Sequence, residues 1–120
     1  MGEGYVQYAA GTIRKQLKEV ARRVYNEGVR VGIIRRAKLV LGIIPPKDIE
    51  WLKTQDEAYH EEYTAHIRWT DTGMRLHFTR YLKYALESDQ RTITYYRREL
   101  YVGLIPAKDL ELILSREKES

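Results

Sequence analysis

Closely spaced basic residues are the groups in this chain whose type and spacing could do chemistry. Arg14, Lys18 and Arg22 recur at every fourth position, which places them on one face of a helix. A row of cations at this spacing neutralises phosphates and binds nucleic acid without reading its base sequence. Both halves of the chain contribute, and the predicted nucleic-acid-binding residues are Arg14, Lys15, Lys18, Arg22, Arg23, Arg30, Arg35, Arg36, Lys38, Arg75, Arg80, Lys83, Arg91, Arg97 and Arg98.

The alternative for these basic residues is a solvated surface, or one paired with acidic residues of the same or a neighbouring chain. Residues 11–46 carry nine Lys/Arg and two Glu, whereas residues 47–72 carry three Lys/Arg and seven Asp/Glu. The formal net charge is +4. This alternation of charge suits contacts between copies of the chain as well as the binding of a polyanion.

Tyrosines are the second candidate group, because the chain has ten of them. Some lie among arginines, an arrangement that suits stacking on nucleobases or a protein interface rich in Tyr and Arg. The alternative is that most of them fill the core while each hydroxyl finds water or a backbone partner. Ordinary packing also accounts for Trp51 and Trp69. The tyrosines that lie among arginines are Tyr81, Tyr84, Tyr95, Tyr96 and Tyr101.

Residues for catalysis or metal binding do not form a recognisable pattern. His60 and His66 are six positions apart, whereas two metal ligands on one helix lie three or four apart. A Glu62–His66 contact is the expected relation. The chain has no cysteine, which excludes disulfides and thiolate zinc sites. We find no nucleophile coupled to a base and no glycine-rich phosphate loop, so we expect no enzymatic activity, no metal and no cofactor.

The chain contains an internal repeat, and the structural units that it encodes must position these residues. The segment Gly42–Leu52 recurs 61 positions later as Gly103–Ile113 with six identities, and the same offset aligns apolar positions elsewhere. The chain is therefore read as a tandem duplication. We place unit one at about residues 8–62 and unit two at about residues 69–120. A unit of about 60 residues buries too little surface to be stable alone, so we expect both to form a single domain over residues 1–120.

Each unit is predicted to contain three helices. The fold class would then be all-α, a tandem duplication of a three-helix unit forming one helical bundle. Residues 29–31 and 91–94 alternate like strands, but a stripe such as Ile33, Ala37 and Leu41 favours a helix. The predicted helices span residues 12–27, 30–41 and about 47–68 in unit one, and residues 74–87, about 91–102 and about 110–117 in unit two.

The repeated turn is predicted to connect two helices. Its glycine suits a helix C-cap, and its proline stops one helix while suiting the start of the next. An aspartate then lies in the first turn, where the helix dipole favours it. A DNA-reading helix-turn-helix would present these acidic residues to phosphates, which argues against that function. The predicted turn residues are Gly42, Pro45, Asp48, Gly103, Pro106 and Asp109.

Composition and hydropathy limit the cellular locations that we expect for the protein. No run approaches roughly 20 apolar residues, and the first residues lack the basic and apolar regions of a signal peptide. We expect a soluble protein, intracellular or in a virion, that is not secreted by a signal peptide and has no membrane span. Charged residues make up 32% of the chain, a profile similar to that of proteins from hyperthermophiles.

In size, expected helicity and basic charge, the chain resembles the helical coat proteins of archaeal rod-shaped and filamentous viruses. The resemblance is one of architecture and transfers no site residue. It implies a structural protein that packages double-stranded DNA through basic helices and assembles with itself or a related chain. One alternative is a protein-interaction module, such as a virus or phage assembly adaptor. A sequence-specific transcription regulator is the third hypothesis.

Overall fold

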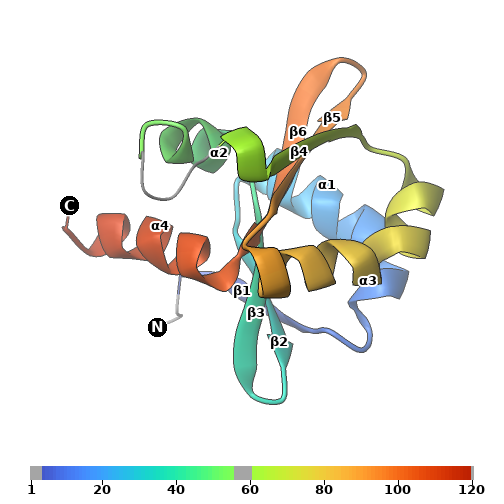
Figure 1. Ribbon diagram of the computed structural model, residues 1–120, viewed down its shortest axis with the longest axis horizontal. Coiled ribbons are helices and arrows are strands. Elements are labelled where there is room, and N and C mark those ends of the chain that lie inside the picture. The colour runs from blue at the N-terminus through green and yellow to red at the C-terminus, as the bar shows by residue number, and fades with distance from the viewer. Residues whose placement is uncertain (1–3, 56–60, 120) are drawn as a thin grey trace.

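The computed structural model describes residues 4–55 and 61–119 and shows an α/β fold, so the all-α prediction is wrong. Within these residues six strands form one mixed sheet, which four α-helices cover (Figure 1). The elements of unit one are β1 (Val6–Ala9), the 3-10 helix η1 (Ile13–Gln16), α1 (Leu17–Glu27), β2 (Val31–Arg35), β3 (Lys38–Ile44) and α2 (Pro46–Leu52). Unit two begins earlier than the predicted residue 69, because β4 takes the place of β1, and its elements are the 3-10 helix η2 (Glu61–Tyr63), β4 (Thr64–Arg68), α3 (Asp71–Ser88), β5 (Arg91–Tyr96), β6 (Glu99–Pro106) and α4 (Ala107–Glu119).

Both units follow one order of strand, helix, hairpin and helix. The first strand of each unit, β1 or β4, pairs in parallel with the hairpin's first strand, β2 or β5. The two hairpins join through the antiparallel strands β3 and β6, which gives the sheet order β1-β2-β3-β6-β5-β4. Gly42 pairs with Ile105 and Ile44 pairs with Gly103, so the register is reciprocal. The two units are therefore related by an approximate twofold axis through the centre of the sheet.

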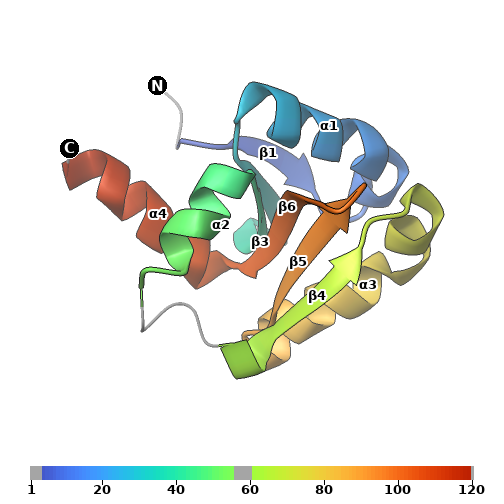
Figure 2. The ribbon, with the colours of Figure 1, turned by 90° about the horizontal axis from the view of Figure 1, so that it is seen from above.

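The helices form one layer on each face of the sheet (Figures 1 and 2). Helices α1 and α3 cover one face with a core that includes Val24 and Phe78, whereas α2 and α4 cover the other with a core that includes Ile49 and Leu110. The central strands are thus buried on both sides. Residues 40–44 of β3 and residues 101–106 of β6 are all buried.

The predicted helices at residues 30–41 and 91–102 are wrong, since both segments are β-hairpins. Their turns place non-glycine residues in the left-handed region, with φ of 53° and 64° at Arg36 and Ala37 and of 52° and 67° at Arg97 and Arg98. Two consecutive positive φ angles are typical of the tight type I′ hairpin turn, whose usual sequence signal is Asn-Gly or Asp-Gly. These turns lack that signal. Strands covered on both faces also lose the polar alternation that would have identified them.

Three of the other four predicted helices are confirmed, and one is wrong. Residues 12–27 form η1 and α1, which ends at Gly28 with φ of 71°. Residues 74–87 lie within α3, where the hydroxyl of Thr70 accepts a hydrogen bond from the Gly73 backbone N–H at 3.0 Å. Residues 110–117 lie within α4. The predicted helix at residues 47–68 is wrong: α2 ends at Leu52 and β4 begins at Thr64, while residues 56–60 lie outside the described residues.

The repeated glycines do not cap helices. Gly42 lies within β3 and Gly103 within β6, and neither has a positive φ. A Cβ atom at Gly42 would lie 3.1 Å from Cβ of Leu110, and one at Gly103 would lie 3.1 Å from Cγ1 of Ile49. Both glycines therefore let a helix of the opposite unit approach the sheet closely.

The rest of the repeated turn begins a helix, as predicted, but it follows a strand. Pro45 is the N-cap residue of α2, and Pro106 ends β6 immediately before α4. Asp48 and Asp109 lie in the first turns of α2 and α4. Because α2 packs on β6 and α4 packs on β3, each unit supplies a helix to the core of the other.

Candidate nucleic-acid interface

Eight of the predicted basic residues lie on α1 with η1 and on α3, which pack side by side. The apolar side chains of α1, such as Leu17 and Val24, are buried against the sheet, and the cations therefore lie on the outer side of the helix. We call this surface the basic layer. Its residues are Arg14, Lys15, Lys18, Arg22, Arg23, Arg75, Arg80 and Lys83.

Arg14 and Arg75 join the two units within the basic layer. They occupy the same position of the repeat, and Nε of Arg14 donates a hydrogen bond to the backbone oxygen of Arg75 at 3.1 Å. The cations of α1 and α3 therefore form one surface that crosses the approximate twofold axis.

Ion pairs do not neutralise most of this surface. Arg23 pairs with Glu27 at 3.4 Å. Within residues 4–55 and 61–119, the other seven cations of the basic layer form no ion pair. The η1, α1 and α3 segments carry eight Lys/Arg and four Asp/Glu, a net charge of +4, whereas α2 and α4 carry four Lys/Arg and six Asp/Glu, a net charge of −2. The acidic helices cover the opposite face of the sheet.

Five more of the predicted cations lie at the hairpin ends. The two hairpins point to opposite ends of the molecule (Figure 1), so their cations do not form one cluster. The guanidinium carbon of Arg97 lies 5.2 Å from the ring centroid of Tyr96, a cation–π contact. The residues at the hairpin ends are Arg35, Arg36, Lys38, Arg97 and Arg98, all of them exposed.

The last two predicted cations, Arg30 and Arg91, are bound by aspartates. Nη2 of Arg91 donates to Oδ1 of Asp109 at 3.0 Å, and both side chains are almost fully buried. Arg30 binds Asp48 in the same way: each arginine donates two hydrogen bonds to its aspartate, from Nε to Oδ2 and from Nη2 to Oδ1, and the second bond of Arg30 is also 3.0 Å. Burial raises the pKa of Asp109, and the charge of Arg91 opposes that shift. Arg30 and Arg91 thus form equivalent structural ion pairs, of which that of Arg91 is buried and that of Arg30 is partly buried.

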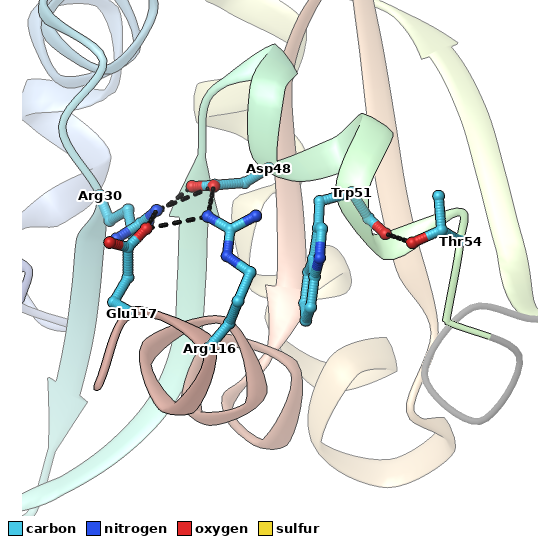
Figure 3. A network of polar contacts seen from close by, with 6 residues as sticks. All are labelled: Arg30, Asp48, Trp51, Thr54, Arg116 and Glu117. Atoms are coloured by element: carbon cyan, nitrogen blue, oxygen red, sulfur yellow. Dashed lines mark hydrogen bonds and ion pairs between the residues drawn. The ribbon is translucent and has the colours of Figure 1, made fainter. Parts of the chain in front are cut away.

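The Arg30 pair extends to the surface through α4 (Figure 3). Glu117 accepts hydrogen bonds from Arg30 and from Arg116, each at 2.8 Å, and these bonds lower the pKa of Glu117 to about 2. The guanidinium carbon of Arg116 lies 4.7 Å from the ring centroid of Trp51. This network connects the start of β2 with α2 and with the end of α4, so it holds elements of both units together.

Four aromatic side chains gather beside the basic layer. The ring of Tyr101 lies 5.1 Å from that of Tyr25, 5.4 Å from that of Tyr96 and 5.2 Å from that of Trp69, measured between centroids. Burial raises the pKa of the Tyr101 hydroxyl. Arg22 of the basic layer lines the same site. We call Tyr25, Trp69, Tyr96 and Tyr101 the aromatic cluster.

The remaining tyrosines highlighted by the sequence have other surroundings. Tyr81 is partly buried against the core, and Tyr84 is exposed on α3. The hydroxyl of Tyr95 lies 3.0 Å from Nδ1 of His66, whose Nε2 lies 3.0 Å from Oε1 of Glu61. His66 is on β4, so its carboxylate partner is Glu61 rather than the predicted Glu62.

Three further sequence-based expectations concern a metal site, a membrane span and the repeated turn. Among the described residues no group of three or more potential ligands could hold a metal ion, and His60 lies outside them. No described helix is long and apolar enough to span a membrane. The repeated turn connects β3 to α2 and β6 to α4, so it is not a helix-turn-helix.

Sequence reasoning missed Tyr25 and Trp69 as members of the aromatic cluster. A signal was present in the repeat for Tyr25, because Leu86 replaces it at the offset of 61. The counterpart of Trp69 in the sheet is Ala10, since their backbone N–H groups donate to the equivalent residues Tyr95 and Ile34. Positions where two equivalent units differ are positions that their common fold does not dictate. Comparison with protein-family models, with curated proteins and with solved structures gave no match.

Proposed function

We propose that this protein binds double-stranded DNA through the basic layer, without reading base sequence. The observation that carries the proposal is the set of seven exposed cations that form no ion pair within the described residues. Unpaired exposed cations on one face release condensed counterions when they meet phosphates, and this release drives non-specific binding. Cations that face only water release no condensed counterions and contribute no binding free energy.

The distribution of charge supports this proposal over a merely solvated surface. Six acidic residues lie in the α2 and α4 layer, on the other side of a buried sheet. Of the four in the described η1, α1 and α3 segments, Glu27 alone forms an ion pair with the basic layer. The contact of Arg14 with the Arg75 backbone makes the two basic rows continuous. A polyanion that crosses both helices can therefore contact both units at once.

Assembly with copies of the chain is the second part of the proposal. Within the described residues, β1 and β4 are the edges of the sheet. An edge strand carries backbone N–H and C=O groups that can pair with another strand. The two edges are equivalent in the repeat, which suits a chain of molecules joined edge to edge. The all-α architecture on which the coat-protein resemblance relied is absent, so that resemblance adds no support.

Fluorescence anisotropy with two duplexes of unrelated sequence, at several salt concentrations, tests the DNA-binding proposal. We expect equal affinity for both duplexes. The logarithm of the association constant should fall with the logarithm of salt concentration, with a slope of roughly −4 to −6 if most of the seven cations each neutralise one phosphate. No binding at low salt would refute the proposal and favour a protein-binding adaptor.

A charge-reversed variant tests the location of the interface. Replacing Arg14, Lys18 and Arg22 together with Glu should abolish duplex binding while the circular dichroism spectrum stays unchanged, since Arg14 on η1 and Lys18 and Arg22 on α1 are all exposed. Equal binding by this variant and the wild type would show that the basic layer is not the interface.

The matched control reverses three exposed lysines near α2 and α4. Replacing Lys47, Lys53 and Lys108 with Glu changes the net charge by the same amount, and all three are exposed. We expect this control to keep most of the affinity. Electron microscopy with and without duplex DNA tests assembly: DNA-dependent filaments that dissolve at high salt would support it, and single particles in every condition would refute it.

A further inference from the structure

We propose that the aromatic cluster receives an unpaired nucleobase of a nucleic acid held by the basic layer, an inference that rests on the proposed function. Two adjoining cavities of about 310 and 230 Å³ share Tyr25, Tyr96 and Tyr101. The larger cavity lies at the lower end of the range of about 300–1,000 Å³ that is typical of small-ligand sites. The site lies between the end of α1, the β5–β6 hairpin and the start of α3.

Tyr101 forms the fixed wall of this site. It is 9% exposed, and Trp69 packs its ring edge-on against the Tyr101 ring, with 70° between the ring planes. Tyr25 and Tyr96 are 39% and 44% exposed and tilt by 40° and 36° relative to Tyr101. Two accessible aromatic rings therefore flank a buried one, an arrangement in which a planar base could stack.

The fold does not require this aromatic cluster. At the equivalent positions of unit one, Val40 replaces Tyr101 and Arg35 replaces Tyr96, while Leu86 of unit two replaces Tyr25. The hairpin and helix form in both halves all the same. Core packing thus explains Tyr101 in part, but it does not explain two half-exposed tyrosines on one side of the molecule.

The charges around the cluster select a nucleotide over a purely apolar ligand. Arg22 lines the smaller cavity and Arg97 lines the larger one, so a phosphate on either side of the base would meet a guanidinium. Carboxylates also line the site: Glu99 in the larger cavity and Asp71 in the smaller. Asp71 accepts a hydrogen bond from Nε1 of Trp69 at 2.9 Å. Carboxylates can accept hydrogen bonds from the N–H groups of bases, such as the exocyclic amino group of cytosine or N3–H of thymine.

The basic layer leads to this site. Arg14 lies at the centre, where it contacts the Arg75 backbone, and Lys18 and Arg22 follow at intervals of four residues toward the end of α1. Arg22 belongs both to this row and to the smaller cavity. A sugar-phosphate backbone that follows the row would bring a base next to Tyr25, one helical turn beyond Arg22.

Removal of the two exposed rings tests the proposal. In the variant with Tyr25→Leu and Tyr96→Leu, we expect the affinity for oligothymidylate to fall roughly fivefold to a hundredfold, the range that stacking on an aromatic ring contributes per base. Leucine occupies the position of Tyr25 in the other unit, so folding should persist. The duplex affinity should not change. The matched control is Tyr84→Leu, a tyrosine that is also 39% exposed but lies outside the cluster.

An abasic oligonucleotide of the same length separates stacking from charge. The wild type should bind it as weakly as the double variant binds oligothymidylate, and the double variant should not distinguish the two probes. In a Trp51→Phe background, the remaining Trp69 should report oligothymidylate binding by a change in fluorescence that the abasic probe does not produce.

The outcomes distinguish the two proposals. If the wild type binds neither the duplex nor oligothymidylate, the proposed function fails, and the inference about the cluster fails with it. If the duplex is bound but the double variant keeps the wild-type affinity for oligothymidylate, the inference is overturned while the proposed function stands. Loss of oligothymidylate binding in Tyr84→Leu as well would also overturn it, because the effect would not be confined to the cluster.

Discussion

Ile43 and Leu104 are paired residues in the central antiparallel strands, and they occupy the same position of the two repeat units. A residue that faces its own equivalent marks the approximate twofold axis. On either side of this pair the register is reciprocal, and each glycine of the repeated motif lies beneath the helix of the other unit. Because the two units are equivalent, a substitution in one unit can be compared with the same substitution at the equivalent position of the other.

Gly42→Ala should destabilise the protein by about 1–3 kcal/mol, the usual cost of overpacking a close contact. The new Cβ would meet Cβ of Leu110 at 3.1 Å, and that atom is fixed to the helix backbone. Gly103→Ala should cost less, because its nearest neighbours are Cγ1 and Cδ1 of Ile49, which can rotate. Urea unfolding monitored by circular dichroism measures both values.

The control for these substitutions is Gly11→Ala. No atom lies within 4 Å of a Cβ placed there, apart from the residue's neighbours in the chain, so we expect little change in the free energy of unfolding. Wild-type stability in Gly42→Ala would contradict the close helix–sheet packing described above.

Arg91→Met should destabilise the protein by about 3–5 kcal/mol, since it leaves the buried carboxylate of Asp109 without its guanidinium partner. Arg30→Met should cost less. The side chain of Arg30 is 10% exposed, and Arg116 lies 3.6 Å from Asp48 as a second cation. Thermal melts of the two variants under one buffer condition provide the comparison.

A double variant tests the cause of the Arg91 effect. Combining Arg91→Met with Asp109→Leu removes both charges, and the stability should return to near that of the wild type. A double variant as unstable as Arg91→Met alone would mean that packing volume, not an uncompensated charge, sets the cost.

Ala37→Gly should stabilise the protein by about 0.5–1 kcal/mol. Ala37 has a φ of 64°, which costs a side-chain-bearing residue more than it costs glycine, and this gain exceeds the extra entropy glycine loses on folding. Ala9→Gly in the edge strand β1 is the control, and it should destabilise by a similar amount. Equal effects of the two substitutions on the unfolding midpoint would refute the strained-turn interpretation.

The network around Glu117 makes stability depend on pH. The folded-state pKa of Glu117 lies at about 2, below its ordinary 4.5, so its ionised form stabilises the fold above about pH 4.5 and this contribution is lost as the pH falls toward about 2. Glu117→Gln should therefore be less stable than the wild type at neutral pH, and the difference should close over this interval. A difference in the urea midpoint that is constant from pH 6 to pH 2 would contradict this assignment.

The sequence predicted helices well where one side faces water. Helices α1 and α3 have an apolar stripe against the sheet and charges outside, so their periodicity is visible. Prediction from sequence failed for the hairpins, because residues 40–44 are buried from both sides and show no alternation of apolar and polar residues. The internal repeat was visible in the sequence. Its most similar segments, Gly42–Leu52 and Gly103–Ile113, connect a strand to a helix and not a helix to a helix, since a glycine before a proline suits a helix end as well as a tightly covered strand.

The candidate site was predictable only in part. The spacing of Lys18 and Arg22 alone places them on one face of α1, whereas Arg14 lies on the preceding η1. The burial of Arg91 depends on an aspartate 18 residues away, which proximity in the chain does not reveal. The aromatic cluster draws Tyr25 and Trp69 from different units, and only the folded sheet brings them together.

The exchange of helices between the units also has an evolutionary meaning. A single ancestral unit would have left its glycine strand uncovered, and two identical copies could cover each other as a symmetric dimer. Joining the two copies in one gene removed the requirement that both be identical. The two copies could then diverge, so that one carries Tyr25 where the other has Leu86 and the other carries Tyr96 where the first has Arg35, an asymmetry that no homodimer can encode.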